Sequence, residues 1–231
     1  MTDLFDFLII FFIVAIISYL PVAGPYFKLF NTMIHESGHA FTAVLTGGRV
    51  TSVSLFKNTG GLTITRHKGW GGKVLTLLAG YPAASIASVV YIFVLTQHWY
   101  DYLAVGLGAL LIYSLLFWVR NVLGWLWGLS VCGALYIIYT NQYGNWFEYS
   151  ITIIGAALLI QAFISCWVIF MLSIKGNGQA GDASALAEAT KIPAPFWGFF
   201  FLLQGTFFFA FGVFILAGYD AGSIIEFLWL F

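Results

Sequence analysis

Charged side chains are scarce in this sequence: it has 9 Lys and Arg and 9 Asp and Glu, 8% of its 231 residues. A soluble domain of this size carries roughly a quarter charged residues, so a water-soluble globular domain is excluded. The net charge is zero and the basic residues are scattered singly, so no nucleic-acid partner is expected. Hydrophobic residues reach 61% and the mean hydropathy is +0.94. The composition therefore predicts an integral membrane protein whose immediate partner is the lipid bilayer.

Cysteine is scarce in the sequence, and no cleavable leader is recognisable at its start. The two cysteines, Cys132 and Cys166, both lie in apolar runs and do not have the short spacing of a metal-binding pair. We interpret each as a buried, inert thiol. Residues 4–22 have no preceding basic residue and no small-residue cleavage site. This first apolar run is therefore predicted to be a retained transmembrane helix.

Several apolar stretches are long enough to cross a bilayer, which takes about 20 residues of helix. They cover residues 4–22, 28–46, 74–96, 103–119, 122–140, 149–174 and 195–217. We predict an all-α polytopic membrane protein with six to seven transmembrane helices, forming one membrane-embedded domain over residues 1–231. Residues 175–193 are expected to form a cytoplasmic loop, and residues 218–231 an interfacial tail.

Basic residues alternate between the connections. Five of the nine, Arg49, Lys57, Arg66, Lys68 and Lys73, follow the second stretch. Others occur at Arg120 and in 175–193, whereas 97–102 and 141–148 contain none. Positive residues favour the cytoplasmic side, so with seven spans the amino terminus is predicted to be cytoplasmic. Lys28 is the exception.

The second stretch contains the motif His35-Glu36-Ser37-Gly38-His39. Two histidines four residues apart lie on one face of a helix, so both rings can bind the same metal ion. Glu36 lies about 100° around the helix from His35, which suits a general base better than a ligand. Imidazole and carboxylate groups are costly within a membrane, so these residues are expected to serve a function.

A third ligand is missing nearby, because no histidine follows His39 closely and the next sixty positions contain no acidic residue. The predicted sides of the membrane leave Asp182 and Glu188. We favour Asp182, since a carboxylate added to two histidines suits Zn²⁺. The alternative is that Asp182 serves only as the N-cap of a short helix.

Residues 49–56 and 62–65 alternate β-branched and other side chains on either side of Asn58-Thr59-Gly60-Gly61. This pattern predicts a β-hairpin, although a β-rich loop is the alternative. An extended substrate can add to a strand edge, so Val53 and Leu55 are candidate substrate-binding residues. Asn121 is a third, since its amide can donate to a substrate carbonyl. The alternative for Asn121 is a helix N-cap.

The motif and its continuation through Gly47-Gly48-Arg49-Val50 resemble the site-2 protease-type membrane metallopeptidases, and more narrowly their small M50B-like branch, found in bacteria and plants. Gly181-Asp182-Ala183, Ile192-Pro193 and Trp197 are similar to a late element of that branch. The resemblance implies zinc-dependent peptide hydrolysis, with His35 and His39 as zinc ligands and Glu36 as the catalytic residue. The broader family places its third ligand in an Asp-Gly motif, which this sequence lacks; Asp182 takes that place here.

We therefore expect a zinc-dependent intramembrane endopeptidase. It would act on a membrane-protein or peptide substrate and be located in a bacterial cytoplasmic membrane. The alternative is a non-proteolytic membrane scaffold or assembly subunit that keeps a vestigial or structural metal site. A transporter is less favoured, because charged residues inside the stretches are nearly absent beyond the motif.

Overall fold

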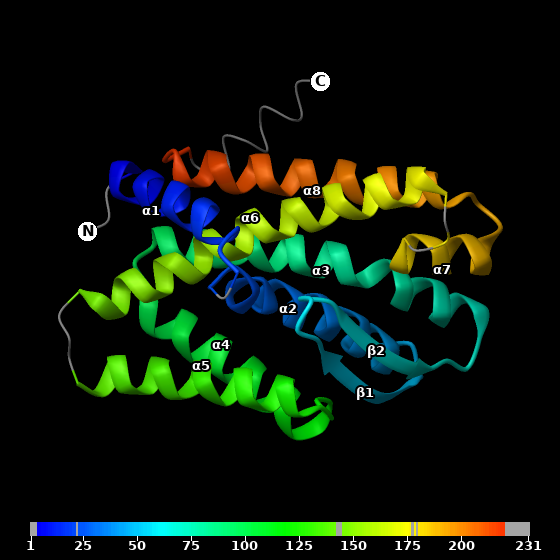
Figure 1. Cartoon of the computed structure of the whole chain (residues 1–231), viewed down its shortest axis with the longest axis horizontal. Helices are drawn as coiled ribbons and strands as arrows, with labels where there is room; N and C mark the ends of the chain where they lie inside the picture. Colours follow the sequence, from blue (N-terminus) through cyan, green and yellow to red (C-terminus); the bar gives the residue numbers. More distant parts are fainter. Residues whose placement is uncertain (1–3, 22, 142–144, 177, 179, 220–231) are drawn as a thin grey trace.

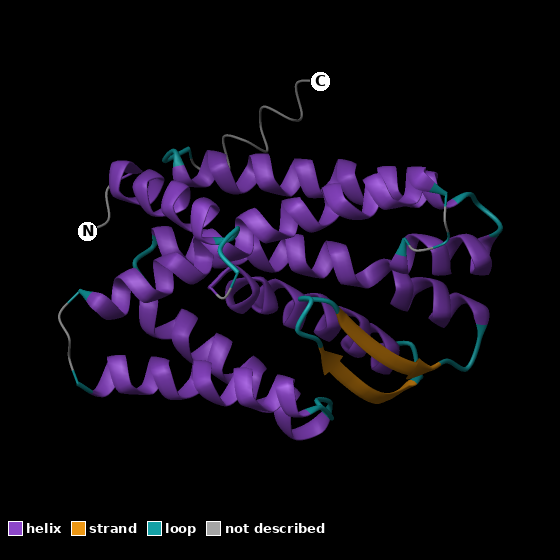
Figure 2. Ribbon diagram, in the orientation of Figure 1, coloured by secondary structure: helices purple, strands orange, loops and turns teal. Residues whose placement is uncertain are grey.

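The computed structural model describes residues 4–21, 23–141, 145–176, 178 and 180–219. Within them the chain forms long helices that lie roughly along one axis, with one β-hairpin on the side of the bundle (Figures 1 and 2). The elements are α1 (Leu4–Ile17), α2 (Ala23–Leu45), β1 (Arg49–Leu55), β2 (Gly61–Arg66), α3 (Trp70–Thr96), α4 (Tyr100–Phe117), α5 (Val122–Thr140), α6 (Trp146–Lys175), α7 (Gly181–Thr190) and α8 (Ala194–Leu216). The predicted all-α polytopic architecture with a small hairpin is confirmed.

Helix α6 forms the centre of the bundle. Every residue from 154 to 162 is buried, because α6 packs against α1, α2, α3 and α8. Its partner α8 carries a glycine every seven residues, and each faces a side chain on α6. These pairs are Gly198 with Ser173, Gly205 with Cys166, and Gly212 with Leu159. A Cβ at any of the three glycines would collide with α6, so small residues allow the two helices to pack closely.

Among the described residues, five helices are long and apolar enough to cross a membrane by length and composition: α3, α4, α5, α6 and α8. The other two predicted spans are also helical. However, α1 has only 14 residues, which is short for a membrane span, and α2 contains the polar motif, which lowers its hydrophobicity. Residues 220–231, which make up most of the predicted interfacial tail, lie outside the described residues.

Helices α1 and α2 follow one another in the same direction along the bundle, so together they traverse it once (Figure 1). Ile9 and Ile10 accordingly lie beside Trp146 and Tyr149 at the start of α6. The helix breaks after Ile17, because Pro21 has no N–H and disfavours helix in the residue before it. The sequence predicts that the amino terminus and the basic connection share a side, whereas α1 and α2 together make a single pass along the bundle. The start of α1 lies at the opposite end of the bundle from the hairpin base and α7.

The hairpin follows α2 directly. Gly47, with φ of 75°, ends the helix, and the Gly48 N–H donates to Ala43 O, so a left-handed glycine caps the helix. The strands pair antiparallel, with Val53 opposite Thr63, and an irregularity lies between Val50 and Ser52. The hairpin runs along α2, since Thr32 Oγ1 donates to Thr59 O at 2.7 Å.

Helices α4 and α5, of 18 and 19 residues, are shorter than α3 and α6, of 27 and 30. The hairpin lies next to the turn that joins α4 to α5. There Val53 forms a parallel bridge with Val119, so that the turn between α4 and α5 continues the sheet on the outer side of β1. The hairpin is thereby fixed between α2 and this turn.

Candidate metal centre

Helix α2 places His35 and His39 one turn apart on the face that packs against α3. Their Nε2 atoms are 3.0 Å apart, and the two rings are nearly perpendicular at 84°. Gly38, between them, lies against Ala83 and the Ala79 carbonyl of α3, where a Cβ would collide. The absence of a side chain at position 38 thus allows α3 to approach the two imidazoles closely.

Helix α7 brings Asp182 to the same point, although it lies 147 residues from His35 in the sequence. Asp182 Oδ2 is 3.1 Å from His35 Nε2 and 3.2 Å from His39 Nε2. The N-cap position of α7 is Ala180, and no side chain caps this helix. The N-cap alternative for Asp182 is therefore wrong.

Contacts at the far end of α7 fix its position. Trp70, the first residue of α3, donates its indole N–H to Ala189 O at 2.7 Å, and Trp197 of α8 donates to Thr190 Oγ1 at 3.2 Å. Leu186, in the middle of α7, is fully buried. With α7 held in this way, the carboxylate in its first turn has a defined position.

Helix α3 closes the site from behind. His39 Nδ1 lies 2.6 Å from Thr76 O, so Nδ1 carries the proton and the Nε2 lone pair points into the site. The two rings lie directly against Gly80, where a Cβ would come within 2.6 Å of both Nε2 atoms. The ring of Tyr81 packs edge-on against His35, with the centroids 4.5 Å apart.

The three converging atoms suit a zinc ion. Tetrahedral ligands about 2.0–2.2 Å from Zn²⁺ lie roughly 3.3–3.6 Å from one another, close to the 3.0–3.2 Å that separates these three atoms. Burial by itself would raise the pKa of the Asp182 carboxyl, but the imidazoles of His39 and His35 hold that pKa well below its ordinary value. Were a metal ion bound, both imidazoles would be neutral, and with the ionised carboxylate they would form a donor set typical of catalytic zinc sites, in which three ligands leave a fourth position for water.

Replacing Asp182 by asparagine is expected to weaken zinc binding by at least about tenfold. Asparagine keeps the size and helix-start preference of aspartate, but it removes the negative charge that faces the two histidines. Zinc affinity of the purified protein, measured by competition with a chromophoric chelator, checks this. Glu188→Gln is the matched control, because Glu188 is an exposed acid on the same helix. An unchanged affinity in Asp182→Asn would remove Asp182 from the ligand set.

Glu36 is buried, with 5% of its surface exposed, and points toward β2 rather than toward the histidine ring atoms. Thr63 Oγ1 lies 2.5 Å from Glu36 Oε2 and donates to it. Gly61, two residues earlier on the same face of β2, leaves the space that the carboxylate occupies. Glu36 is not part of the cluster formed by His35, His39 and Asp182. The structure therefore places a carboxylate beside the site, oriented by the hairpin, where a general base can act.

We expect Thr63→Val to lower peptidase activity about tenfold while zinc content stays unchanged. Valine has nearly the same shape as threonine, but it cannot donate the hydrogen bond that orients Glu36. Cleavage rate and metal content of the same preparation check this. Thr65→Val is the control, because Thr65 is the next residue on that face of β2 and bonds His67 instead. Equal activities of Thr63→Val and wild type would show that this bond does not orient the base.

The three candidate substrate-binding residues hold the hairpin together. Val53 N–H donates to Trp118 O and Val53 O accepts from Arg120 N–H, at 2.8 and 3.1 Å. Asn121 Oδ1 accepts from Leu55 N–H and its Nδ2 donates to Leu55 O, at 3.1 and 2.5 Å. The outer edge of β1 is thus already paired, and the Val53 and Leu55 side chains are buried. Asn121 is the N-cap residue of α5, as the alternative predicted, but its side chain makes no capping bond, because it bonds Leu55 instead.

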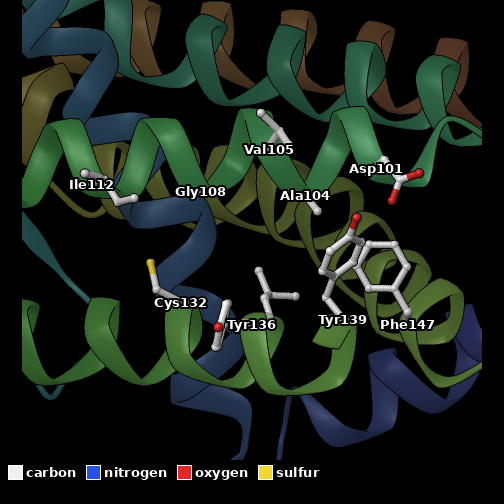
Figure 3. A pocket seen from close by; sticks show the side chains of 10 residues that line it. Asp101, Ala104, Val105, Gly108, Ile112, Cys132, Tyr136, Tyr139 and Phe147 are labelled. Carbon is white, nitrogen blue, oxygen red and sulfur yellow. The ribbon is translucent and has the colours of Figure 1, made fainter. Parts of the chain in front are cut away.

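Other polar groups lie apart from this centre. Glu188 is exposed, His67 bonds Thr65, and His98 bonds Tyr100. In the part of the chain that the structure describes, one group of at least three His, Cys, Asp or Glu side chains could hold a metal ion. It consists of His35, His39 and Asp182. A separate cleft of about 300 Å³ opens between α4 and α5 (Figure 3). It is lined by Asp101, Ala104, Val105, Gly108, Ile112, Cys132, Leu135, Tyr136, Tyr139 and Phe147, none of which belongs to the site.

Sequence reasoning did not find the residues that support the site. They are Thr63 and Gly61 beside Glu36, Thr76 and Gly80 beside the histidines, and Trp70 beside α7. A signal existed for Gly80, since it stands in Gly80-Tyr81-Pro82 within an apolar stretch, where a glycine indicates a close approach. Backbone and threonine contacts leave no comparable signal in one sequence.

One of the comparisons with known proteins finds a family that matches this chain. The family model described as Peptidase M50B-like matches residues 7–212. No curated protein matches the chain, and no solved structure matches it. The match covers most of the chain, including the motif on α2 and Asp182 on α7. The chain is thus a member of the Peptidase M50B-like family of membrane metallopeptidases.

Proposed function

We propose that this protein is a zinc-dependent endopeptidase that hydrolyses a peptide bond in or near a transmembrane segment of a membrane protein. The observation that carries the proposal is the convergence of His35 Nε2, His39 Nε2 and Asp182 Oδ2. Glu36 lies next to His35 on the same helix, as a separate and buried carboxylate. Family membership and five helices able to cross a membrane support the same conclusion.

His35, His39 and Asp182 would hold the ion. Bound Zn²⁺ supplies a Lewis acid that polarises the scissile carbonyl and acidifies a water molecule. Glu36 accepts a proton from the attacking water and delivers it to the nitrogen of the departing amine, which returns Glu36 to its carboxylate form. The hydrogen bond from Thr63 keeps that carboxylate in place between the two transfers.

The substrate is proposed to bind in extended form along β2. The sheet has two strands in the order β1-β2, and the outer edge of β1 is paired with the α4–α5 turn. The outer edge of β2 is therefore the one to which an extended peptide can add. Because Thr63 of β2 bonds Glu36, a peptide on this edge lies one strand away from the base. Asn121, Val53 and Leu55 then act indirectly, by fixing the hairpin.

We place the hairpin base and α7 on the cytoplasmic side of the membrane. The hairpin connection and the first turn of α3 together carry five of the nine basic residues, and positive residues favour the cytoplasmic side. Since α1 and α2 traverse the bundle once (Figure 1), the start of α1 and the end of α8 both lie on the opposite side. A cysteine introduced near either end checks this by its labelling in intact cells.

Metal removal tests the proposed function. Purified protein in liposomes is expected to contain about one zinc per chain and to cleave a single-span membrane substrate. Chelation should abolish cleavage, and Zn²⁺ should restore it, whereas Mg²⁺ should not, since it prefers six oxygen ligands. A protein that retains zinc but cleaves none of a panel of single-span substrates would favour the scaffold alternative.

A further inference from the structure

The face of the hairpin that points away from α2 changes from apolar to basic along its length. The inner face, toward α2, carries Gly61, Thr63 and the buried Val53 and Leu55. On the outer face of β2 lie Leu62 and Ile64, 49% and 47% exposed, followed by the exposed Arg66. These three side chains occupy alternate positions of one strand and are exposed, so packing against α2 does not account for the two aliphatic residues.

At the base of the hairpin two arginines stand directly opposite each other. Arg49 pairs with Arg66 in the antiparallel register, and both are exposed. Like charges in directly opposed positions destabilise a strand pair. The ion pairs found among the described residues join only histidines to Asp182, so no described carboxylate lies within 4 Å of either guanidinium. A bound anion between the two guanidiniums would turn this repulsion into attraction.

The direction of the hairpin determines which anion fits. Its turn lies beside Thr32, and its base lies beside Ala43 and Gly48 at the end of α2. The hairpin thus runs along the helices, with its turn toward the middle of the bundle and its base toward one end (Figure 1). In the strand register Leu62 and Ile64 lie nearer the turn, and Arg49 and Arg66 lie at the base. From Leu62 to Arg66 a strand extends about 13 Å, comparable with half the hydrocarbon thickness of a bilayer. Lys57, in the turn, lies at the other end of the hairpin and is not part of this arrangement.

We propose that the outer face of the hairpin binds one anionic phospholipid, with its phosphate between Arg49 and Arg66 and an acyl chain along Ile64 and Leu62. Guanidinium groups bind phosphate oxygens in a bidentate manner, and the aliphatic side chains then face hydrocarbon rather than water. An acidic peptide would satisfy the arginines but would leave Leu62 and Ile64 without an apolar partner, so the lipid is favoured. This site is independent of the metal centre.

The test measures which lipids remain bound to the protein. Wild-type protein is equilibrated in detergent micelles containing equal amounts of phosphatidylglycerol and phosphatidylcholine, and retained lipids are counted by native mass spectrometry. Preferential retention of phosphatidylglycerol is expected. Each basic residue near an anionic surface contributes enough to change binding about fivefold, so Arg49→Gln combined with Arg66→Gln should reduce the preference at least about tenfold. Replacing both by lysine, which keeps charge but not bidentate geometry, should give an intermediate loss.

The matched control is Lys175→Gln combined with Lys191→Gln. Both lysines are exposed and lie at the same end of the bundle, so this pair removes the same charge away from the hairpin, and it should keep the preference. An unchanged preference in the double arginine variant, or an equal loss in the lysine control, would overturn the proposal. So would displacement of the lipid by inorganic phosphate alone or by a soluble acidic peptide. Unchanged zinc content of each variant shows that it is folded.

Discussion

Glu36→Gln is expected to lower the rate of peptide cleavage by about a thousandfold, the range that a lost general base produces, while the zinc content remains that of the wild type. Glutamine fits the same space beside Gly61 and can still accept the hydrogen bond from Thr63. It cannot take a proton from water. Glu36 is not part of the cluster that would hold the ion, so metal binding should not change. Single-turnover cleavage of a membrane substrate and metal analysis of the same sample measure both quantities.

The comparison with Asp182→Asn makes this result specific. Loss of a ligand should lower zinc content and activity together, whereas loss of the base should lower activity alone. Glu188→Gln, an exposed acid outside the site, should change neither. Wild-type cleavage by Glu36→Gln would rule out Glu36 as the base, and loss of zinc would show that Glu36 contributes to the metal site.

The central motif could be predicted from sequence because its geometry is local. His35 and His39 lie one turn apart in any helix that spans them, and the Gly47-Gly48 pair and the β-branched segments after it predict a helix end and a hairpin. Asp182, 147 residues from His35, was accessible in another way. So few acidic residues occur in this sequence that the side of the membrane left only two candidates.

What sequence reasoning missed depends on how distant segments meet. Residues 4–22 are apolar throughout, so hydropathy alone predicts a continuous span; the break after Ile17 depends on Pro21 and on packing against α6. Asn121 has a residue type and position typical of an N-cap, but it bonds Leu55 because β1 lies beside the α4–α5 turn. Pairing of β1 with residues 118–120 is a long-range contact that a single sequence does not reveal. The sequence alone therefore points to β1 as the strand along which a substrate binds, whereas the edge that we propose is that of β2.

Gly80→Ala is expected to abolish zinc binding, with at least about a 100-fold loss of affinity, although it adds only one methyl group. The new Cβ would come within 2.6 Å of His35 Nε2 and His39 Nε2, the two atoms that would contact the ion. Helix α3 cannot move away easily, because α6 and α8 also pack against it. The imidazoles must therefore rotate, which also breaks the bond from His39 Nδ1 to Thr76 O.

The same substitution improves the intrinsic helix propensity of α3 by about 1 kcal/mol, so local helix stability and zinc binding are expected to change in opposite directions. Gly71→Ala in the same helix gives the matched control, since a Cβ there meets no atom within 4 Å. The control should retain zinc and activity, and Gly80→Ala should lose both while keeping wild-type helical circular dichroism. If Gly80→Ala retained zinc at wild-type affinity, the imidazoles could not lie against α3 as described. The inward orientation of both Nε2 atoms depends on this contact, so the result tests the metal centre itself.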